Sequence, residues 1–586
     1  MQTRLLLLCY MSLSLLLSSC QAPSSQSHQA AEPVSFELPD EVKFYGGLDY
    51  IQAWLVHTQK YAQTAYPKAP VFTMMLPILL AQQLGLKHPN EIDLIRGMRW
   101  FAIPKKPNSS LADKPIIDRW DSMILLPIKD AQKTKTTLSK KLWQVANNQD
   151  DVFTSKIPDQ PGFLYLRDRY LILCSQAIWC EKYHQDLITY AETETLPALT
   201  LAMRPSSLPL EQWMQKLQAQ EASIDQQDMM QVLNHMRSAD AFQIALQVKS
   251  DQLAIELQMK LGDDSSVQQE LASYTHDATD ALQRIPDHAR GVLMFYPKIF
   301  ASLWKLLQNK KDLQKDLQKH VNHQVQLDLQ PLLQQIQQQA IGQYASHLTS
   351  IFVDPQLQLS ALLAGKSSTL QPLVHQFLKY CKAQFESGAW DTSRVRSQAQ
   401  ATPLQLKLSQ AKMLKDYTTE SLTVLNPPTT KNAQTSPQLQ DLSVQLSELR
   451  TLYTPDFTWF AFGPKSRDIL KDLHQRFQIH QGQKSLMSHD GLSDLHNAFK
   501  RLVFFFYITP NVIGKATQKF LNVTPIGQKR SKNGQEQPVA TGLSLMLAAH
   551  DAQRYFIRLT VPVEVAEQIS TSIHLFKALI SNPQSK

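Results

Sequence analysis

The feature that most constrains the fold of this chain is a recurring order of strand, helix, hairpin and helix. The clearest copy lies near the end of the chain, where residues 542–562 alternate apolar and polar side chains around a short His-Asp-Ala-Gln turn, and residues 563–580 place apolar side chains at helical spacing. Alternation indicates half-buried strands, and helical spacing indicates an amphipathic helix. We therefore expect Leu545 and Ile557 in the helix-covered core, and Ser544 and Arg558 on the opposite faces.

The same order occurs upstream. One copy runs from a strand at 196–205 through a helix at 208–220 to a hairpin at 241–261, another has its hairpin at 346–365, and a partial copy has a hairpin at 162–174 that turns around Asp168. Each copy would form a small sheet with one apolar face, and its helices would supply a matching apolar stripe. The predicted fold class is α+β, with several small antiparallel sheets that have helices packed on one face and are repeated along an elongated multidomain body.

The length of 586 residues, together with polar and proline-containing stretches, suggests several domains. We expect the following parts: a signal peptide at 1–19, a lipidated cysteine and flexible tether at 20–35, an N-terminal α+β domain at 36–190, an α+β repeat unit at 191–285, a second repeat unit with a long Gln-rich helical insertion at 286–390, an irregular linker at 391–445, and a C-terminal α+β domain at 446–586.

The N-terminal segment predicts export. Arg4 precedes an apolar run, Leu5–Leu17, which is shorter than the roughly 20 residues of a membrane-spanning helix and therefore resembles a secretory signal. The sequence Leu17-Ser18-Ser19-Cys20 resembles the lipobox of bacterial lipoproteins, which implies cleavage before Cys20 and a palmitate-type acyl anchor on its thiol. Gln21, rather than Asp, follows the cysteine, and the family pattern then favours the outer membrane, facing the periplasm, over the inner membrane.

Cys174 and Cys180 are a candidate disulfide. An oxidising periplasm permits the bond if the turn between them brings their Cα atoms to about 4.4–6.8 Å. Their spacing differs from that of redox-active or zinc-binding cysteine pairs, so we expect no catalytic role for them.

No motif in the sequence defines a reaction, a cofactor or a metal site. The net charge of +8 is spread thinly, so we expect no nucleic-acid partner. Ser302 and Lys305 match a Ser-x-x-Lys pattern without its companion motifs, and His320 and His323 lack a carboxylate in a metalloprotease motif. We therefore expect no enzymatic activity, no cofactor and no metal.

The pattern over residues 120–580 also resembles that of large uncharacterised exported bacterial proteins with degenerate strand-helix-hairpin-helix repeats. That resemblance implies no catalytic residues. The sequence thus predicts a non-enzymatic, membrane-anchored envelope lipoprotein that acts as a binding or scaffold component through repeated α+β modules, with an envelope protein or a lipid as its partner. Two alternatives remain open at this point: a periplasmic carrier of lipid or another apolar ligand, and an envelope hydrolase.

Overall fold

The chain divides into two compact units. Unit 1 comprises Met1–Gln212, Leu233–Ser265 and Gln553–Lys586, and unit 2 comprises Trp213–Val232 and Ser266–Ala552. The computed structural model describes residues 39–66, 69, 71, 73, 75–105, 120–138, 140, 142–146, 149–157, 162–196, 198–204, 239–262, 268–269, 272, 277–295, 349–354, 358–364, 367–386, 406–413, 417–425, 448–478, 485–486, 492, 496–510, 512, 542–551, 553–567 and 569–570.

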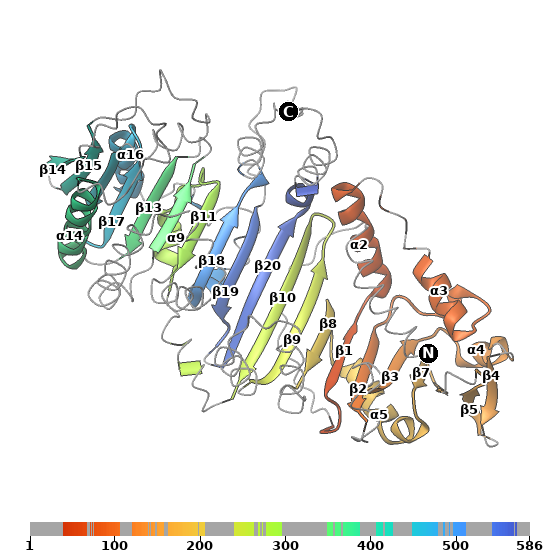
Figure 1. The fold of residues 1–586 in the computed structure, drawn as a ribbon. Helices are drawn as coiled ribbons and strands as arrows, with labels where there is room; N and C mark the ends of the chain where they lie inside the picture. Colours follow the sequence, from red (N-terminus) through yellow and green to blue (C-terminus); the bar gives the residue numbers. More distant parts are fainter. Residues whose placement is uncertain are drawn as a thin grey trace, which may run out of the picture. The chain divides into compact units, whose positions relative to one another are not determined.

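Unit 1 contains one antiparallel sheet (Figure 1). Its strands follow in the order β20 (Arg554–Pro562), β10 (Gln252–Leu261), β9 (Ala239–Val248), β8 (Leu199–Met203), β1 (Phe44–Leu48), β2 (Met98–Pro104), β3 (Trp120–Pro127), β7 (Tyr170–Cys174), β6 (Phe163–Arg167), β5 (Gln149–Ser155) and β4 (Trp143–Ala146). The turn between β6 and β7 falls at Asp168 as predicted, and Asp168 has a positive φ of 44°, a conformation that Asp tolerates better than most residues.

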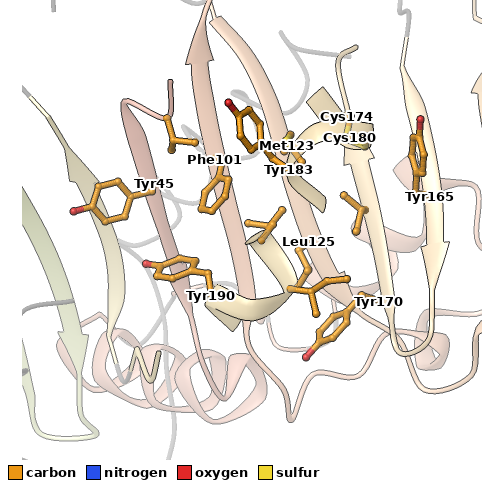
Figure 2. Packing of buried hydrophobic residues seen from close by; sticks show 14 of the residues in the cluster. Tyr45, Phe101, Met123, Leu125, Tyr165, Tyr170, Cys174, Cys180, Tyr183 and Tyr190 are labelled. Atoms are coloured by element: carbon orange, nitrogen blue, oxygen red, sulfur yellow. A yellow bond between two sulfur atoms is a disulfide. The ribbon is translucent and has the colours of Figure 1, made fainter. Parts of the chain in front are cut away.

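Helices cover both faces of this sheet. The helical elements that the structure describes here are α2 (Ile51–Ala65), α3 (Met75–Leu84), η1 (Pro89–Glu91), α4 (Ala131–Thr137) and α5 (Ala177–Thr193). On one face, α5 packs its buried Tyr183 and Tyr190 into a core with Tyr45, Phe101 and Met123 (Figure 2). On the other face, α2 packs over the ends of β1, β8, β9 and β10. The alternation of side chains along each strand assigns the two helices to opposite faces.

A buried ion pair ties β2 to the chain segment between α5 and β8. Arg99 is fully buried, and its Nη1 lies 2.7 Å from Oδ1 of Asp49 and 3.0 Å from the carbonyl oxygen of Met98. Its Nη2 donates to the carbonyl oxygen of Glu194, and Asp49 Oδ2 accepts from the backbone N–H of Leu196 at 2.6 Å. The charges are thus paired and hydrogen-bonded, which is the condition for burying them without a large cost.

The strands of unit 2 also pair edge to edge and antiparallel. Its strands follow in the order β19 (Leu543–Ala549), β18 (Leu502–Ile508), β11 (Gly291–Phe295), β12 (Thr349–Val353), β13 (Leu359–Ala364), β17 (Phe457–Phe462), β16 (Glu448–Tyr453), β15 (Tyr417–Val424) and β14 (Leu406–Met413). The helices described are α9 (Thr279–Arg284), α14 (Ser367–Glu386), α16 (Ser466–Gln478) and α17 (His496–Phe499). Val374 and Leu378 of α14 pack on one face, and His474 of α16 meets Tyr417 on the other, with 4.9 Å between ring centroids.

The predicted fold class is wrong. The described strands do not form several small sheets with helices on one face, because the strands of each unit join edge to edge into a single large antiparallel sheet with helices on both faces. The joins pair β1 with β8 and β10 with β20 in unit 1, and β11 with β18 and β13 with β17 in unit 2. Hairpin alternation specifies strands and their faces but leaves the outer N–H and C=O groups unpaired, and edge-to-edge pairing satisfies them.

Candidate binding surface

A row of exposed and partly exposed aliphatic side chains crosses four neighbouring strands of unit 1. Leu201 on β8 pairs with Ile244 on β9, Ile244 pairs with Leu257 on β10, and Leu257 pairs with Ile557 on β20. Ile255 lies on the same face of β10, two residues from Leu257. We call these five residues the apolar strip. Leu201, Ile244, Ile255 and Ile557 are between 37% and 44% exposed, so the strip forms a contiguous apolar surface rather than scattered single residues.

Helix α2 lies on the same face as the apolar strip. It packs Tyr61 and Ala62 against Val248 of β9, and Leu246 and Leu253 of the same face pack against this cluster. The hydroxyl of Tyr61 donates to the carbonyl oxygen of Val561 at 3.0 Å, so α2 also contacts β20. At its other end, Ile51 and Leu55 pack with Leu48, and Leu199 and Met98 border that cluster. Within the part of the chain that the structure describes, α2 therefore crosses the strands from β1 to β20, and the side chains of Leu201, Ile244 and Ile557 beside it remain 40–44% exposed.

Trp100 extends the apolar surface beyond the strip. Gly46 of β1 pairs with Leu201 on one side and with Trp100 on the other. A Cβ atom on Gly46 would lie 2.7 Å from Cζ2 of the Trp100 indole, so the indole occupies the space above the glycine. Only glycine permits this close approach. The apolar surface thus continues from β8 to β2 across the position that carries no side chain.

The opposite face of the same four strands is more buried and more polar. Ala202, Thr200 and Ala254 are almost completely buried there. Glu256 of β10 faces Arg558 of β20, with 3.7 Å between Oε2 and Nη1, and the side chains of both are less than one fifth exposed. Gln258 donates to Glu256 Oε1 at 2.6 Å. In a sheet with one solvated face, the polar residues normally face water, so these strands show the reverse arrangement.

This arrangement corrects the sequence-based assignment of faces. Ile557 is 41% exposed rather than in a helix-covered core. On β19, Ser544 and Met546 are buried, whereas Leu545 is only partly buried. The prediction assumed that the more apolar face of each strand is the covered one, and the sequence contains no signal that would have identified the strip as exposed.

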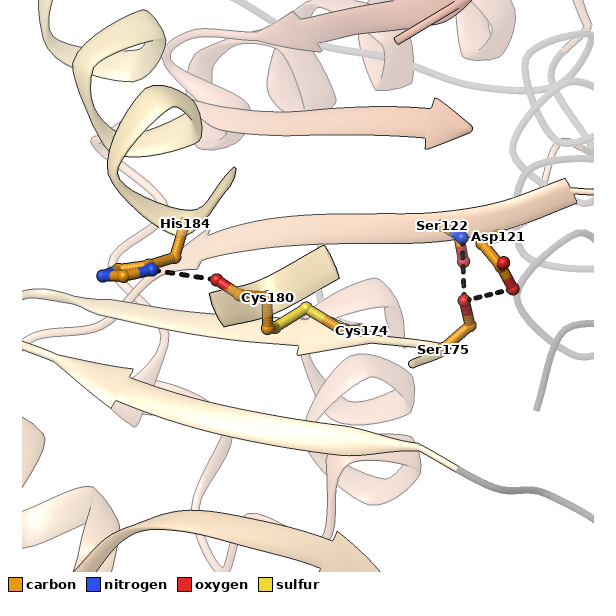
Figure 3. The surroundings of a disulfide bond; sticks show 6 residues. All are labelled: Asp121, Ser122, Cys174, Ser175, Cys180 and His184. Carbon is orange, nitrogen blue, oxygen red and sulfur yellow. Dashed lines mark hydrogen bonds between the residues drawn. A yellow bond between two sulfur atoms is a disulfide. The ribbon is translucent and has the colours of Figure 1, made fainter. Parts of the chain in front are cut away.

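The cysteine pair named from the sequence lies in a disulfide in the structure (Figure 3). The Cα atoms of Cys174 and Cys180 are 6.0 Å apart, and the bond joins β7 to the first turn of α5. Both cysteines are fully or almost fully buried. Cys20, the predicted lipidation site, lies outside the described residues, as do Ser302, Lys305, His320 and His323.

Polar groups beside the disulfide hold the start of α5. Asp121 of β3 is 3% exposed and accepts hydrogen bonds from Ser175 Oγ at 3.0 Å, Gln176 Nε2 at 2.7 Å and Trp179 Nε1 at 3.1 Å. Ser175 Oγ in turn accepts from the backbone N–H of Ser122 at 3.1 Å, as Figure 3 shows. A negative charge near a helix N-terminus is stabilising, so this cluster has a structural role in seating α5.

Unit 2 contains one buried carboxylate next to an imidazole. Glu420 of β15 is 2% exposed, and it accepts from Tyr453 Oη at 2.9 Å and lies 2.9 Å from Nδ1 of His375 on α14. A carboxylate fixes the orientation and tautomer of such a ring, which is useful in catalysis and in metal binding. Within the part of the chain that the structure describes, however, no three His, Cys, Asp or Glu residues come together to hold a metal. The 2.9 Å contact between His375 and Glu420 joins α14 to β15.

Comparisons with known proteins add no assignment. No protein-family model, curated protein or solved structure matches this chain. Among the helices of the described ranges, none combines the length and the apolar character needed to cross a membrane.

Proposed function

We propose that this chain is an envelope lipoprotein, acylated at Cys20 and held at the outer membrane on the periplasmic side, and that it acts as a non-enzymatic binding component. The observation that carries the binding function is the apolar strip. Four strands expose aliphatic side chains on one face, whereas the side chains of the Glu256–Arg558 ion pair on the other face are less than one fifth exposed. Contact with water would favour the opposite placement of apolar and charged side chains.

The covering of the strip by a partner accounts for this arrangement. An exposed contiguous apolar patch on a folded protein is typical of a site of association, because its burial removes apolar surface from water. The adjacent row on the same face gains this stabilisation from α2, and the strip would gain it from a bound partner.

Two features support the envelope location. The sequence Leu17-Ser18-Ser19-Cys20 has the order of an apolar run, small residues and cysteine that lipoprotein processing requires. The Cys174–Cys180 disulfide fits an oxidising compartment such as the periplasm.

The anchor is tested by Cys20→Ser. We expect this variant to leave the membrane fraction, or to accumulate as an uncleaved precursor, because its side chain lacks the thiol that is acylated. A Cys20→Ser protein that is processed normally and remains in the membrane fraction would show that the anchor is assigned wrongly.

The binding surface is tested by Ile244→Lys in the anchored, full-length protein. A lysine at this exposed position should change stability by less than about 1 kcal/mol, so a loss of binding can be attributed to the surface. The matched control is Ile178→Lys, since Ile178 is 60% exposed on α5, on the opposite face of the sheet. After chemical crosslinking in intact cells, a partner should co-purify with the wild type and with Ile178→Lys but not with Ile244→Lys. Equal recovery from all three proteins would contradict the proposed surface.

A further inference from the structure

We infer that the partner covers the apolar strip with an amphipathic helix that lies beside α2. The inference rests on the proposed function, because it names the kind of element that occupies the proposed surface. Three properties of unit 1 lead to it: the position of α2, the length of the strip, and the apolar character of its residues.

The position of α2 restricts the shape of the occupant. A helix with its side chains is about 10 Å thick, so α2 stands above the sheet by that amount on the same face as the strip. A flat occupant, such as a bilayer surface or a sheet from a second copy, would meet α2 before it reached Ile244. A single helix can lie on the sheet beside α2, because packed helices approach to about 8–10 Å between their axes.

The interface of α2 with the sheet shows that this face accepts a helix. Tyr61, Ala62 and Leu55 of α2 cover one end of β8, β9 and β10 with apolar contacts. Ile255 of the strip pairs with Leu246 at the border of this interface, and the other four strip residues form the next row of the same strands. The strip thus continues an interface that is already built for a helix. A second helix beside α2 would extend this layer as neighbouring helices do in other two-layer folds.

The length of the strip sets the length of the occupant. Neighbouring strands lie about 4.8 Å apart, so the three steps from β8 to β20 span about 14 Å. At a rise of about 1.5 Å per residue, a helix covers this distance with about ten residues. Extension to Trp100 on β2 adds two strand steps and raises the length to about sixteen residues, close to the 15 residues of α2.

The chemistry of the strip sets the sequence pattern of the occupant. Leu201, Ile244, Ile255, Leu257 and Ile557 offer no charge and no side-chain hydrogen bond. The matching helix therefore presents apolar residues at i, i+3 or i+4, and i+7 toward the sheet and polar residues toward water.

Site-specific photo-crosslinking tests the geometry directly. A photoreactive amino acid is placed at Leu201, Ile244 or Ile557, one position at a time, in the anchored full-length protein, and the crosslinked residues are mapped by mass spectrometry. One strand step of about 4.8 Å corresponds to about three residues of helix. We expect the three probes to mark one partner segment, with about three residues between the marks from Leu201 and Ile244 and about ten between those from Leu201 and Ile557. A probe at Ile178 is the control and should not mark this segment.

The outcomes separate the inference from the proposed function. An extended partner segment across the strands would place the outer marks only about four residues apart, which would overturn the helix. Adducts with lipid, or with peptides of this chain alone, would also overturn it, although lipid adducts would leave the strip as a binding surface. If the three strip positions yield no more adducts than Ile178, both the helix and the proposed function fail.

Discussion

The buried pair of Asp49 and Arg99 offers the sharpest test of the packing of unit 1. In Arg99→Met, the apolar side chain keeps much of the volume but removes the cation that contacts Asp49 Oδ1. Asp49 then retains the N–H of Leu196 on Oδ2, while the carbonyl oxygen of Glu194 loses the guanidinium donor. Removal of one partner from a buried ion pair costs about 3–5 kcal/mol, because the other charge stays buried without compensation.

The companion variant is Asp49→Asn, which keeps the shape of the side chain but leaves the Arg99 cation without an opposite charge. We expect each single variant to lose about 3–5 kcal/mol, and the double variant to lose less than the sum of the two. The assay is urea unfolding of the purified full chain, with hydrogen exchange of the β1 and β2 amides reporting on unit 1. Losses below about 1 kcal/mol that add in the double variant would refute a coupled, buried pair.

Three other predictions concern the disulfide and two titrating groups. Replacing both Cys174 and Cys180 by Ala should lower the free energy of unfolding by about 2 kcal/mol, the value for a short closed loop. Thermal unfolding with and without a reductant measures this loss, and an unchanged wild-type Tm on reduction would contradict the prediction. Hydrogen bonds to Lys182, first, and then to Tyr183 lower the pKa of Glu41 from 4.5 to about 2, so these contacts stabilise the fold above pH 4.5 and are lost as the pH falls toward 2. In Lys182→Ala, NMR titration should find the Glu41 pKa raised toward 4.5, and a value that stays near 2 would exclude Lys182 as the main cause. Burial lowers the pKa of His474 below 6.5, so its neutral ring stabilises the fold fully above pH 6.5, and this contribution falls as the pH drops. In urea titrations between pH 6.5 and 5, His474→Phe should make the free energy of unfolding less dependent on pH, and an unchanged pH dependence would exclude His474 as its source.

Local sequence patterns predicted several strands and turns correctly. The hairpin at 241–261 corresponds to β9 and β10, which pair across a turn at Ser250 and Asp251, and the hairpin at 346–365 corresponds to β12 and β13. The turn at Asp168 is also present. These features depend on neighbouring residues, so alternation and turn residues are sufficient to locate them.

The joins between distant strands could not be predicted in the same way. The pairing of β10 with β20 and of β1 with β8 depends on backbone groups that every strand carries, and alternation along a strand does not identify its outer neighbour. The sequence therefore supplied the hairpins but not the single large sheet in each unit.

The buried ion pair and the apolar strip were also beyond the sequence patterns. The sequence around Arg99 does not by itself predict that this side chain is buried. The one feature that could have indicated it is the pair of glycines Gly47 and Gly97. A Cβ on Gly47 would lie 2.5 Å from Cδ of Arg99, and one on Gly97 would lie 2.7 Å from Nη1, so the two glycines provide the space for the side chain. Ile244 and Ile557 are exposed although their apolar side chains favour burial. Hydrophobicity alone does not show whether another element of the fold covers a given side chain.

The pairing of β10 with β20 has a consequence for the synthesis of the chain. The hydrogen bond from Tyr61 to Val561 joins positions 500 residues apart, and β20 supplies the outer neighbour of a strand made much earlier. During translation, the edge of β10 stays unpaired until residues 554–562 have been made, and closing such a long loop is slow. A chain that stops before residue 554 would leave the edge of β10 unpaired. A premature stop there should therefore yield aggregated or degraded protein rather than a shorter folded protein.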